Sequence, residues 1–268
     1  MKAILQSGFL GLAMLAVAVP VNAGPLEDGK AAYDRGDYAT ALKFFRPLAD
    51  QGDAEAQFNL GVIYENGQGV PQDYAEAVKR YRKAAAQGYS LAQYNLGFMY
   101  RNGVGVPQDY TEAVTWLRMA AEQGNTDAQT NLGVMYANGQ GVPQDYAEAV
   151  KWYHKAAAQG YAGAQHNLGV MYAAGQGVPQ DHIEAVRWWR KAADKDHAGA
   201  QHNLGAMYAA GKGVRKDNFL AHLWFNLAAS QGSEKARKLR NKIAEQMTPD
   251  QITEAQHLAR EWMAKHQR

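Results

Sequence analysis

Carboxylates that recur at a fixed spacing are the first candidates for acid–base chemistry in this sequence. An aspartate returns every 36 residues, and in the first four copies a glutamate follows three residues later. The positions are Asp73, Asp109, Asp145, Asp181 and Asp217, and Glu76, Glu112, Glu148 and Glu184. A catalytic pair needs one site whose environment separates two pKa values. We therefore interpret these copied groups as helix caps and solvated side chains, and we expect no catalytic residue and no enzyme.

Histidines are the other candidates for chemistry, as ligands of a metal ion. His166 and His202 are 36 residues apart and occupy equivalent positions in adjacent units, on the order of 10 Å apart if helices pack at their usual distance. A metal ion bridging two imidazoles needs bonds of only about 2 Å. His182 and His197 fall at other positions of the repeat. The chain has no Cys, which excludes thiolate catalysis and Cys-ligated zinc. We expect no metal site and no cofactor.

A tryptophan also recurs once per unit, at Trp116, Trp152, Trp188 and Trp224, with Arg80 at this position in the first copy. Such a row of indole rings is a candidate platform for carbohydrate. An aromatic residue repeated once per unit more often fills the seam between stacked helices. We predict the packing role, with a glycan platform as the alternative.

A 36-residue repeat positions all of these residues. Asn-Leu-Gly returns at 59–61, 95–97, 131–133, 167–169 and 203–205, and residues 59–88 and 131–160 are identical at 26 of 30 positions. Each unit predicts two helices. Ala56, Leu60 and Ile63 lie at helical spacing in the first helix, and Ala77 and Tyr81 are apolar positions of the second. Stacked pairs are required because one pair cannot bury its apolar faces alone.

Glycine, proline and aspartate separate the two predicted helices. Gly61 lies within the first helix, where the missing side chain allows close approach of a neighbouring helix. Asn66-Gly67-Gln68-Gly69 ends that helix, and Asp73 caps the second. Gly88 then ends the second helix. Asp196 stands where this glycine is expected in a later copy, and Asp tolerates the left-handed conformation better than most residues.

This pattern resembles the Sel-one-like repeat, a relative of the tetratricopeptide repeat. The resemblance implies an all-α fold, namely a right-handed α-solenoid of about seven helix-turn-helix repeats that binds other proteins or peptides. We divide the chain into a signal peptide (1–23), a tetratricopeptide-like capping repeat (24–52), five full repeats (53–232) and a C-terminal capping helix pair (233–268). Thr248-Pro249-Asp250-Gln251 predicts a capping box at the start of the last helix.

By the same resemblance, the first helix of each unit lines the concave face, and residues that differ between units determine the partner. The predicted contact surface grades from aromatic and charged residues to small ones along the chain. It is centred on Phe58, Tyr94, Phe98 and Arg101. The full set is Phe58, Asn59, Val62, Tyr94, Asn95, Phe98, Arg101, Thr130, Asn131, His166 and His202. The repeated asparagines either grip a peptide backbone or bond neighbouring helices within the scaffold.

Composition narrows the class of protein. The chain has 268 residues, is 47% hydrophobic and 20% charged, and carries a net charge of +2 without a basic run, so we expect no nucleic-acid partner. Residues 8–19 are apolar and too few to span a bilayer. Val21-Asn22-Ala23 resembles a cleavage site. The absence of Cys and of an Asn-x-Ser/Thr site favours a bacterial periplasm or the medium. Together with what the resemblance implies, we expect an exported protein-interaction scaffold that does not span a membrane. The alternative is an envelope enzyme or accessory acting on peptidoglycan or polysaccharide.

The leader generates the first prediction. Protein recovered from the soluble periplasmic or secreted fraction should begin at Gly24, because the apolar stretch is short and a small-residue cleavage pattern follows it. Intact-mass measurement of that fraction decides the matter. Recovery of a membrane-bound species that retains Met1 would contradict the assignment.

Overall fold

The chain folds into paired helices that follow one another without interruption. The computed structural model describes residues 24–266, and within that range every regular element is a helix. The predicted leader, residues 1–23, lies outside the described residues. The first helices of the pairs are α1 (Gly24–Asp34), α3 (Ala54–Asn66), α5 (Ser90–Asn102), α7 (Thr126–Asn138), α9 (Ala162–Ala174), α11 (Ala198–Ala210) and α13 (Glu234–Ala244). The second helices are α2 (Tyr38–Asp50), α4 (Tyr74–Ala86), α6 (Tyr110–Glu122), α8 (Tyr146–Ala158), α10 (His182–Ala193), α12 (Asn218–Ser230) and α14 (Pro249–His266).

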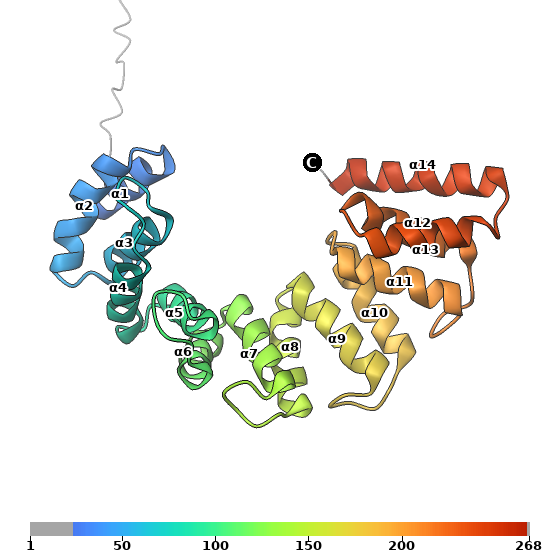
Figure 1. Ribbon diagram of the computed structural model, residues 1–268, viewed down its shortest axis with the longest axis horizontal. Coiled ribbons are helices and arrows are strands. Elements are labelled where there is room, and N and C mark those ends of the chain that lie inside the picture. The colour runs from blue at the N-terminus through green and yellow to red at the C-terminus, as the bar shows by residue number, and fades with distance from the viewer. Residues whose placement is uncertain (1–23, 267–268) are drawn as a thin grey trace, which may run out of the picture.

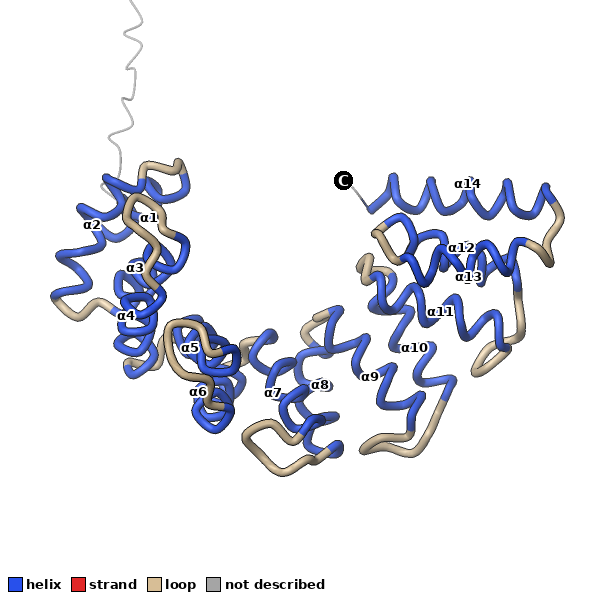
Figure 2. The backbone as a smooth tube through the Cα atoms, viewed as in Figure 1, coloured by secondary structure: helices blue, strands red, loops and turns tan. Residues whose placement is uncertain are grey.

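The pairs stack into an open arc. Each odd-numbered helix from α1 to α11 packs most extensively on the even-numbered helix that follows it, and each even-numbered helix packs next on the odd-numbered helix after it. Figure 1 shows the first and last hairpins facing each other across the interior of the arc, and Figure 2 shows the loops that join the helices. This arrangement confirms the predicted all-α solenoid of about seven helix pairs.

Contacts between glycine and a large side chain determine how closely the two helices of a hairpin approach. A Cβ atom placed on Gly61 would lie 2.5 Å from Cε1 of Tyr81, and one on Gly133 would lie equally close to Tyr153. Tyr81 and Ala77 are fully buried. The prediction that Gly61 marks a close helix contact is confirmed, and the partner is the second helix of the same hairpin.

The predicted caps are present. The Asp73 side chain accepts a hydrogen bond from the backbone N–H of Glu76, and the equivalent aspartates cap α6, α8, α10 and α12 in the same way. Asp196 has a φ of 60°, the left-handed conformation expected where the other copies have glycine. The recurring carboxylates therefore build the scaffold, as their repetition predicted.

The C-terminal end departs from the regular pairing. Thr248 and Gln251 form the predicted capping box, each side chain accepting the other residue's backbone N–H, at 3.0 and 3.2 Å. Both α13 and α14 pack mainly on α12. The last helix thus packs on α12 at the C-terminal end of the solenoid.

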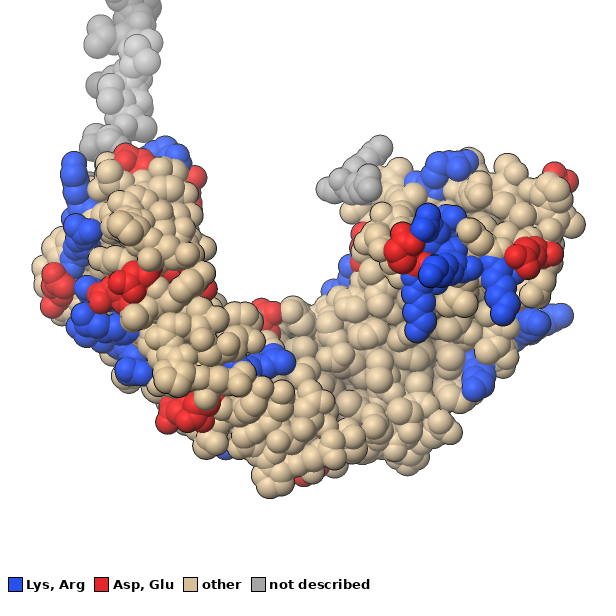
Figure 3. Space-filling view, in the orientation of Figure 1, with Lys and Arg blue, Asp and Glu red and all other residues tan. Residues whose placement is uncertain are grey.

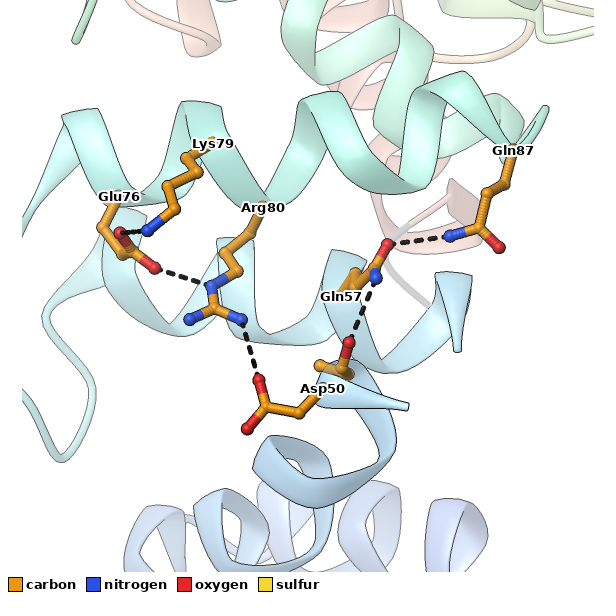
Figure 4. Close-up of polar contacts among 7 residues, drawn as sticks. Asp50, Gln57, Glu76, Lys79, Arg80 and Gln87 are labelled. Atoms are coloured by element: carbon orange, nitrogen blue, oxygen red, sulfur yellow. Dashed lines mark hydrogen bonds and ion pairs between the residues drawn. The ribbon is translucent and has the colours of Figure 1, made fainter. Parts of the chain in front are cut away.

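The recurring tryptophans lie in the seams between hairpins. Trp152 is only 6% exposed and belongs to the core formed by α6 and α7, while Trp116 packs on the core of α4 and α5. Trp188 and Trp224 occupy the corresponding seams further along. The packing role is confirmed. In the first copy, Arg80 replaces the ring with ion pairs to Glu76 at 2.7 Å and to Asp50 of α2 at 3.7 Å (Figure 4).

Buried glutamines join successive repeats through a series of hydrogen bonds. Gln57 donates to the backbone carbonyl of Ala49 at the end of α2, and Gln87 after α4 donates to the Gln57 side-chain oxygen at 2.9 Å (Figure 4). The same bonds recur with Gln93 and Gln123 and with Gln129 and Gln159. Repetition marks this glutamine as part of the unit, but no local pattern predicts its role. We call this set of bonds the glutamine ladder.

Among the described repeats, the bond from one glutamine to the next is missing at the fourth full repeat, although it is present in the fifth between Gln231 and Gln201. Gln165 still donates to the carbonyl of Ala157, but its side-chain oxygen is buried and has no partner. The reason is a single substitution, because position 195 is Lys where the other copies have Gln. The Lys195 side chain lies over Gly160. A buried acceptor without a partner costs more than a hydrogen bond contributes.

We predict that Lys195→Gln raises the free energy of unfolding by about 0.5–1.5 kcal/mol, because it gives the Gln165 oxygen its donor. Thermal and urea unfolding followed by circular dichroism measure the change. Gln159→Lys is the mirror variant, since it breaks an intact step of the ladder, and should destabilise by a similar amount. Equal stability of Lys195→Gln and the parent protein would mean that the Gln165 oxygen is already satisfied by water.

Candidate partner-binding surface

The inner surface of the arc is formed by the odd-numbered helices, which contact one another along it. In Figure 1, α1 lies nearer the interior than α2, and α5 nearer than α6. Lys30 of α1 pairs with Glu55 of α3 at 2.9 Å, and Arg101 of α5 donates to Asn131 of α7. At the C-terminal side α9 also packs against α11. This surface, the concave face, is where the candidate residues lie.

Large apolar side chains are exposed on the concave face at α5. Phe98 is 43% exposed and Leu91 is 47% exposed. The two residues are seven apart, so they lie two turns apart on the same helix face. Val170 on α9, at the position equivalent to Phe98, is 36% exposed. Val62 and Val134, at the same position in their units, are half-buried. An apolar row thus follows the curve and is widest at α5.

Two of the predicted aromatic anchors are partly used by the scaffold. Phe58 is half-buried, with its ring 5.7 Å from that of Tyr81 and 5.2 Å from that of Tyr89. Tyr94 is half-buried against the core of α6 and α7, and burial raises the pKa of its hydroxyl. Both rings therefore contribute to the packing between helices. Of the contact residues predicted from sequence, only Phe98 is exposed, and the others are half-buried.

Polar side chains of the central repeats form hydrogen bonds within the protein. Asn131 accepts from Arg101 and donates to the backbone carbonyl of Asp127, and Thr130 donates to the carbonyl of Thr126. These contacts favour the scaffold role for Asn131. Asn59 differs, because its buried side-chain nitrogen has no partner. Asn95 is half-buried.

The histidines of the C-terminal half come together in a way that spacing did not predict. His197 lies at another position of the repeat, yet as the N-terminal cap of α11 it stacks on His166 with ring centroids 4.6 Å apart. Burial lowers the pKa of His166 to about 4, and the neighbouring His197 adds to the shift. Burial also lowers the pKa of His197 and of His202. All three rings are therefore neutral near pH 7.

Charge is distributed unevenly along the arc. The visible surface over α7 to α9 is mostly uncharged, whereas Lys and Arg gather over the C-terminal helices (Figure 3). No group of three or more His, Asp or Glu side chains in residues 24–266 is arranged to hold a metal ion. None of the described helices is both long and apolar enough to cross a membrane. The arrangement offers contacts for a macromolecular partner, namely apolar anchors, neutral imidazoles and amides.

Comparison with known proteins identifies the repeat. The family model described as "Sel1 repeat" matches residues 21–53, 54–89, 90–125, 126–161, 162–197 and 198–233. Five of the matched segments follow one another directly from 54 to 233, and each is 36 residues long.

Two solved structures are similar over most of the chain. One, the Sel1 repeat protein from Oxalobacter formigenes, is 31% identical with a TM-score of 0.78 and covers 88% of this chain and 99% of that one. The other is described as a protective antigen of uropathogenic Escherichia coli strains displaying an SLR fold. It is 39% identical with a TM-score of 0.79, and the match covers 90% of this chain and 52% of that protein.

A shorter match links the repeats to a curated protein. The rat protein named DAP3-binding cell death enhancer 1 is 38% identical over 61 residues, which is 23% of this chain and 11% of the rat protein. This chain therefore matches only a small part of that relative.

The buried histidine generates a prediction about pH. In the unfolded chain His166 takes up a proton near its ordinary pKa of 6.5, whereas in the folded protein it stays neutral down to about 4. The unfolded state binds more protons in this interval, so the free energy of unfolding falls as the pH drops from about 6.5 to about 4. We expect His166→Gln to remove on the order of 2–3 kcal/mol of that loss.

Thermal unfolding of both proteins at pH 7.5 and pH 4.5 measures this difference. His257→Gln is the control, because His257 is exposed on α14. If His166→Gln and the parent protein lose stability equally on acidification, His166 is not buried in the neutral form.

Proposed function

Because the chain belongs to the Sel1 repeat family, whose solenoid fold is commonly a protein-interaction scaffold, we propose that this protein is an exported scaffold that binds a partner protein or peptide on its concave face. The single observation that carries the proposal is the exposure of Leu91 and Phe98 on the inner side of α5. Exposed apolar residues at neighbouring positions of a concave surface are typical of a binding site.

Positional variation supports the same conclusion. Repeated positions build caps, seams and the glutamine ladder, so a partner is distinguished by positions that differ between units. The position of Phe98 holds Val62, Val134, Val170 and Ala206 in the other units. Binding energy in interfaces concentrates in aromatic and Arg anchors. The side chains at α5 are the bulkiest of this row, and we place the centre of the contact there.

The fold also supports a binding role in place of a catalytic one. The candidate acid–base groups serve as caps and as ion-pair partners, such as Glu148 with Lys151 at 2.8 Å and Glu184 with Arg187 at 3.1 Å. The tryptophans that would form a glycan platform lie in the seams. Export is part of the proposal on the strength of the leader sequence, whose residues 1–23 carry the signal-peptide pattern.

We predict that replacing Leu91 and Phe98 together by Ala weakens partner binding by about 2 kcal/mol or more, because large anchors are removed from the centre of the contact. The partner is first captured by crosslinking in the native host, identified and purified, and its affinity is then measured by calorimetry. Stability should change little, since both side chains are nearly half exposed.

Ile183→Ala provides a matched control, because Ile183 is an apolar residue 68% exposed on an even-numbered helix, α10. It should bind the partner as the parent protein does. Normal binding by the double variant, together with weak binding by Ile183→Ala, would place the contact outside the concave face.

A further inference from the structure

A second surface, at the C-terminal half, differs in chemistry from the site at α5. Two hollows are each lined by residues of α11 together with residues at or within α13. The first has a volume of about 300 Å³ and is lined mainly by apolar side chains, among them Ala206, Phe225, Leu239 and Ile243. The second, of about 320 Å³, is lined by His166, His202, Asn203 and Ser233. We call the two hollows together the α11–α13 groove.

Small side chains on α11 create this groove. Ala206 and Ala209 occupy the positions that hold Phe98 and Arg101 on α5. Because these alanines fill little space, α13 can lie beside α11 with an opening between them, and the Phe225 ring of α12 forms its floor. Each hollow is at the lower end of the volumes typical of binding sites, with space for one or two side chains.

Each of the two hollows is lined by one lysine. Lys242 lines the apolar hollow, and Lys235 lines the hollow that contains the histidines. Both are exposed, and neither forms an ion pair within residues 24–266, whereas Arg237 on the same helix pairs with Glu234. No carboxylate is among the described residues that line the two hollows.

Folding concentrates positive charge here although the sequence has no uninterrupted basic run. Helix α13 carries five basic residues and one acidic residue among its 11 residues. Lys235 lies close enough to His202 to contribute to lowering the pKa of that ring. The groove thus combines an apolar floor with unpaired positive charge, and an acidic, partly apolar segment complements both features.

We propose that the α11–α13 groove binds an extended peptide segment of a partner protein in which acidic residues flank a large aliphatic residue. The aliphatic side chain enters the hollow over Phe225, and the carboxylates reach Lys235 and Lys242. These lysines are seven residues apart, or roughly 10 Å along the helix axis. An extended chain covers that distance in about three residues, so the acidic residues are three apart. The assignment rests on the proposed scaffold function and specifies the chemistry of one partner.

The test is selection of peptides from a phage-displayed library of random dodecapeptides on the purified protein. We expect enriched sequences with two acidic residues about three apart and an aliphatic residue between them. A fluorescein-labelled peptide of the enriched sequence should bind with an affinity that falls as salt rises. Lys235→Glu with Lys242→Glu should weaken this binding at least tenfold. Ala209→Phe, which fills the groove, should do the same.

Matched controls show whether the peptide binds in the groove itself. Lys238→Glu makes the same charge change on α13 at a residue that lines neither hollow, and should alter affinity less than twofold. The Leu91 and Phe98 double variant should bind the peptide with the affinity of the parent protein. A result that disproves partner binding at α5 can therefore be told apart from one that disproves peptide binding in the groove. Circular dichroism checks that every variant keeps its helical content.

Several outcomes would overturn the assignment. These are failure to enrich any peptide, enrichment of sequences without acidic residues, or equal loss of binding in Lys238→Glu. Flotation of the protein with phosphatidylglycerol vesicles through Lys235 and Lys242, without peptide binding, would show that the groove faces an anionic lipid surface.

Discussion

The close contact between a glycine and a large side chain within each hairpin is the constraint on which the rest of the structure depends. From α1 to α12 every first helix carries such a glycine, and the facing residues are Phe45, Tyr81, Leu117, Tyr153, Trp189 and Phe225. A Cβ atom at any of these glycines would overlap the ring or branched side chain opposite. The two helices of each of these hairpins can therefore approach closely, and the hairpins stack into a regular arc.

In a regular stack of repeats, some sequence positions hold the same residue in every unit and others vary between units. The residues at the repeated positions form the seams between hairpins, the aspartate caps and the glutamine ladder. A substitution there changes the stability of its own unit and of the units next to it. The exceptions are local. Arg80 replaces a tryptophan and forms ion pairs with Glu76 of its own helix and with Asp50 of α2. Lys195 replaces a glutamine and leaves the Gln165 oxygen without a partner. Variable positions on the odd-numbered helices remain for recognition.

The two halves of the concave face differ because their variable residues differ in size and charge. At α5 large apolar side chains project into the interior and suit a partner with a complementary hollow. At α11 alanines leave a hollow, and α13 supplies lysines without acidic partners. One curved surface therefore presents an apolar protrusion at α5 and a basic groove at α11 and α13. The face drawn in Figure 3 shows few charged side chains over the helices between them, α7 to α9.

Sequence alone determined the repeat, the helix pairs, the caps and the turns, because these depend on interactions within about ten residues or on the identity of repeated positions. Asp73, Asp196 and the Thr248–Gln251 capping box illustrate this. Only the tertiary structure determined which residues of different units contact each other. The stacking of His197 on His166, the scaffold contacts of Phe58 and Arg101, and the groove between α11 and α13 arise from residues at different positions of the repeat. Periodicity could not pair them, because their distances depend on how far each hairpin turns relative to the previous one.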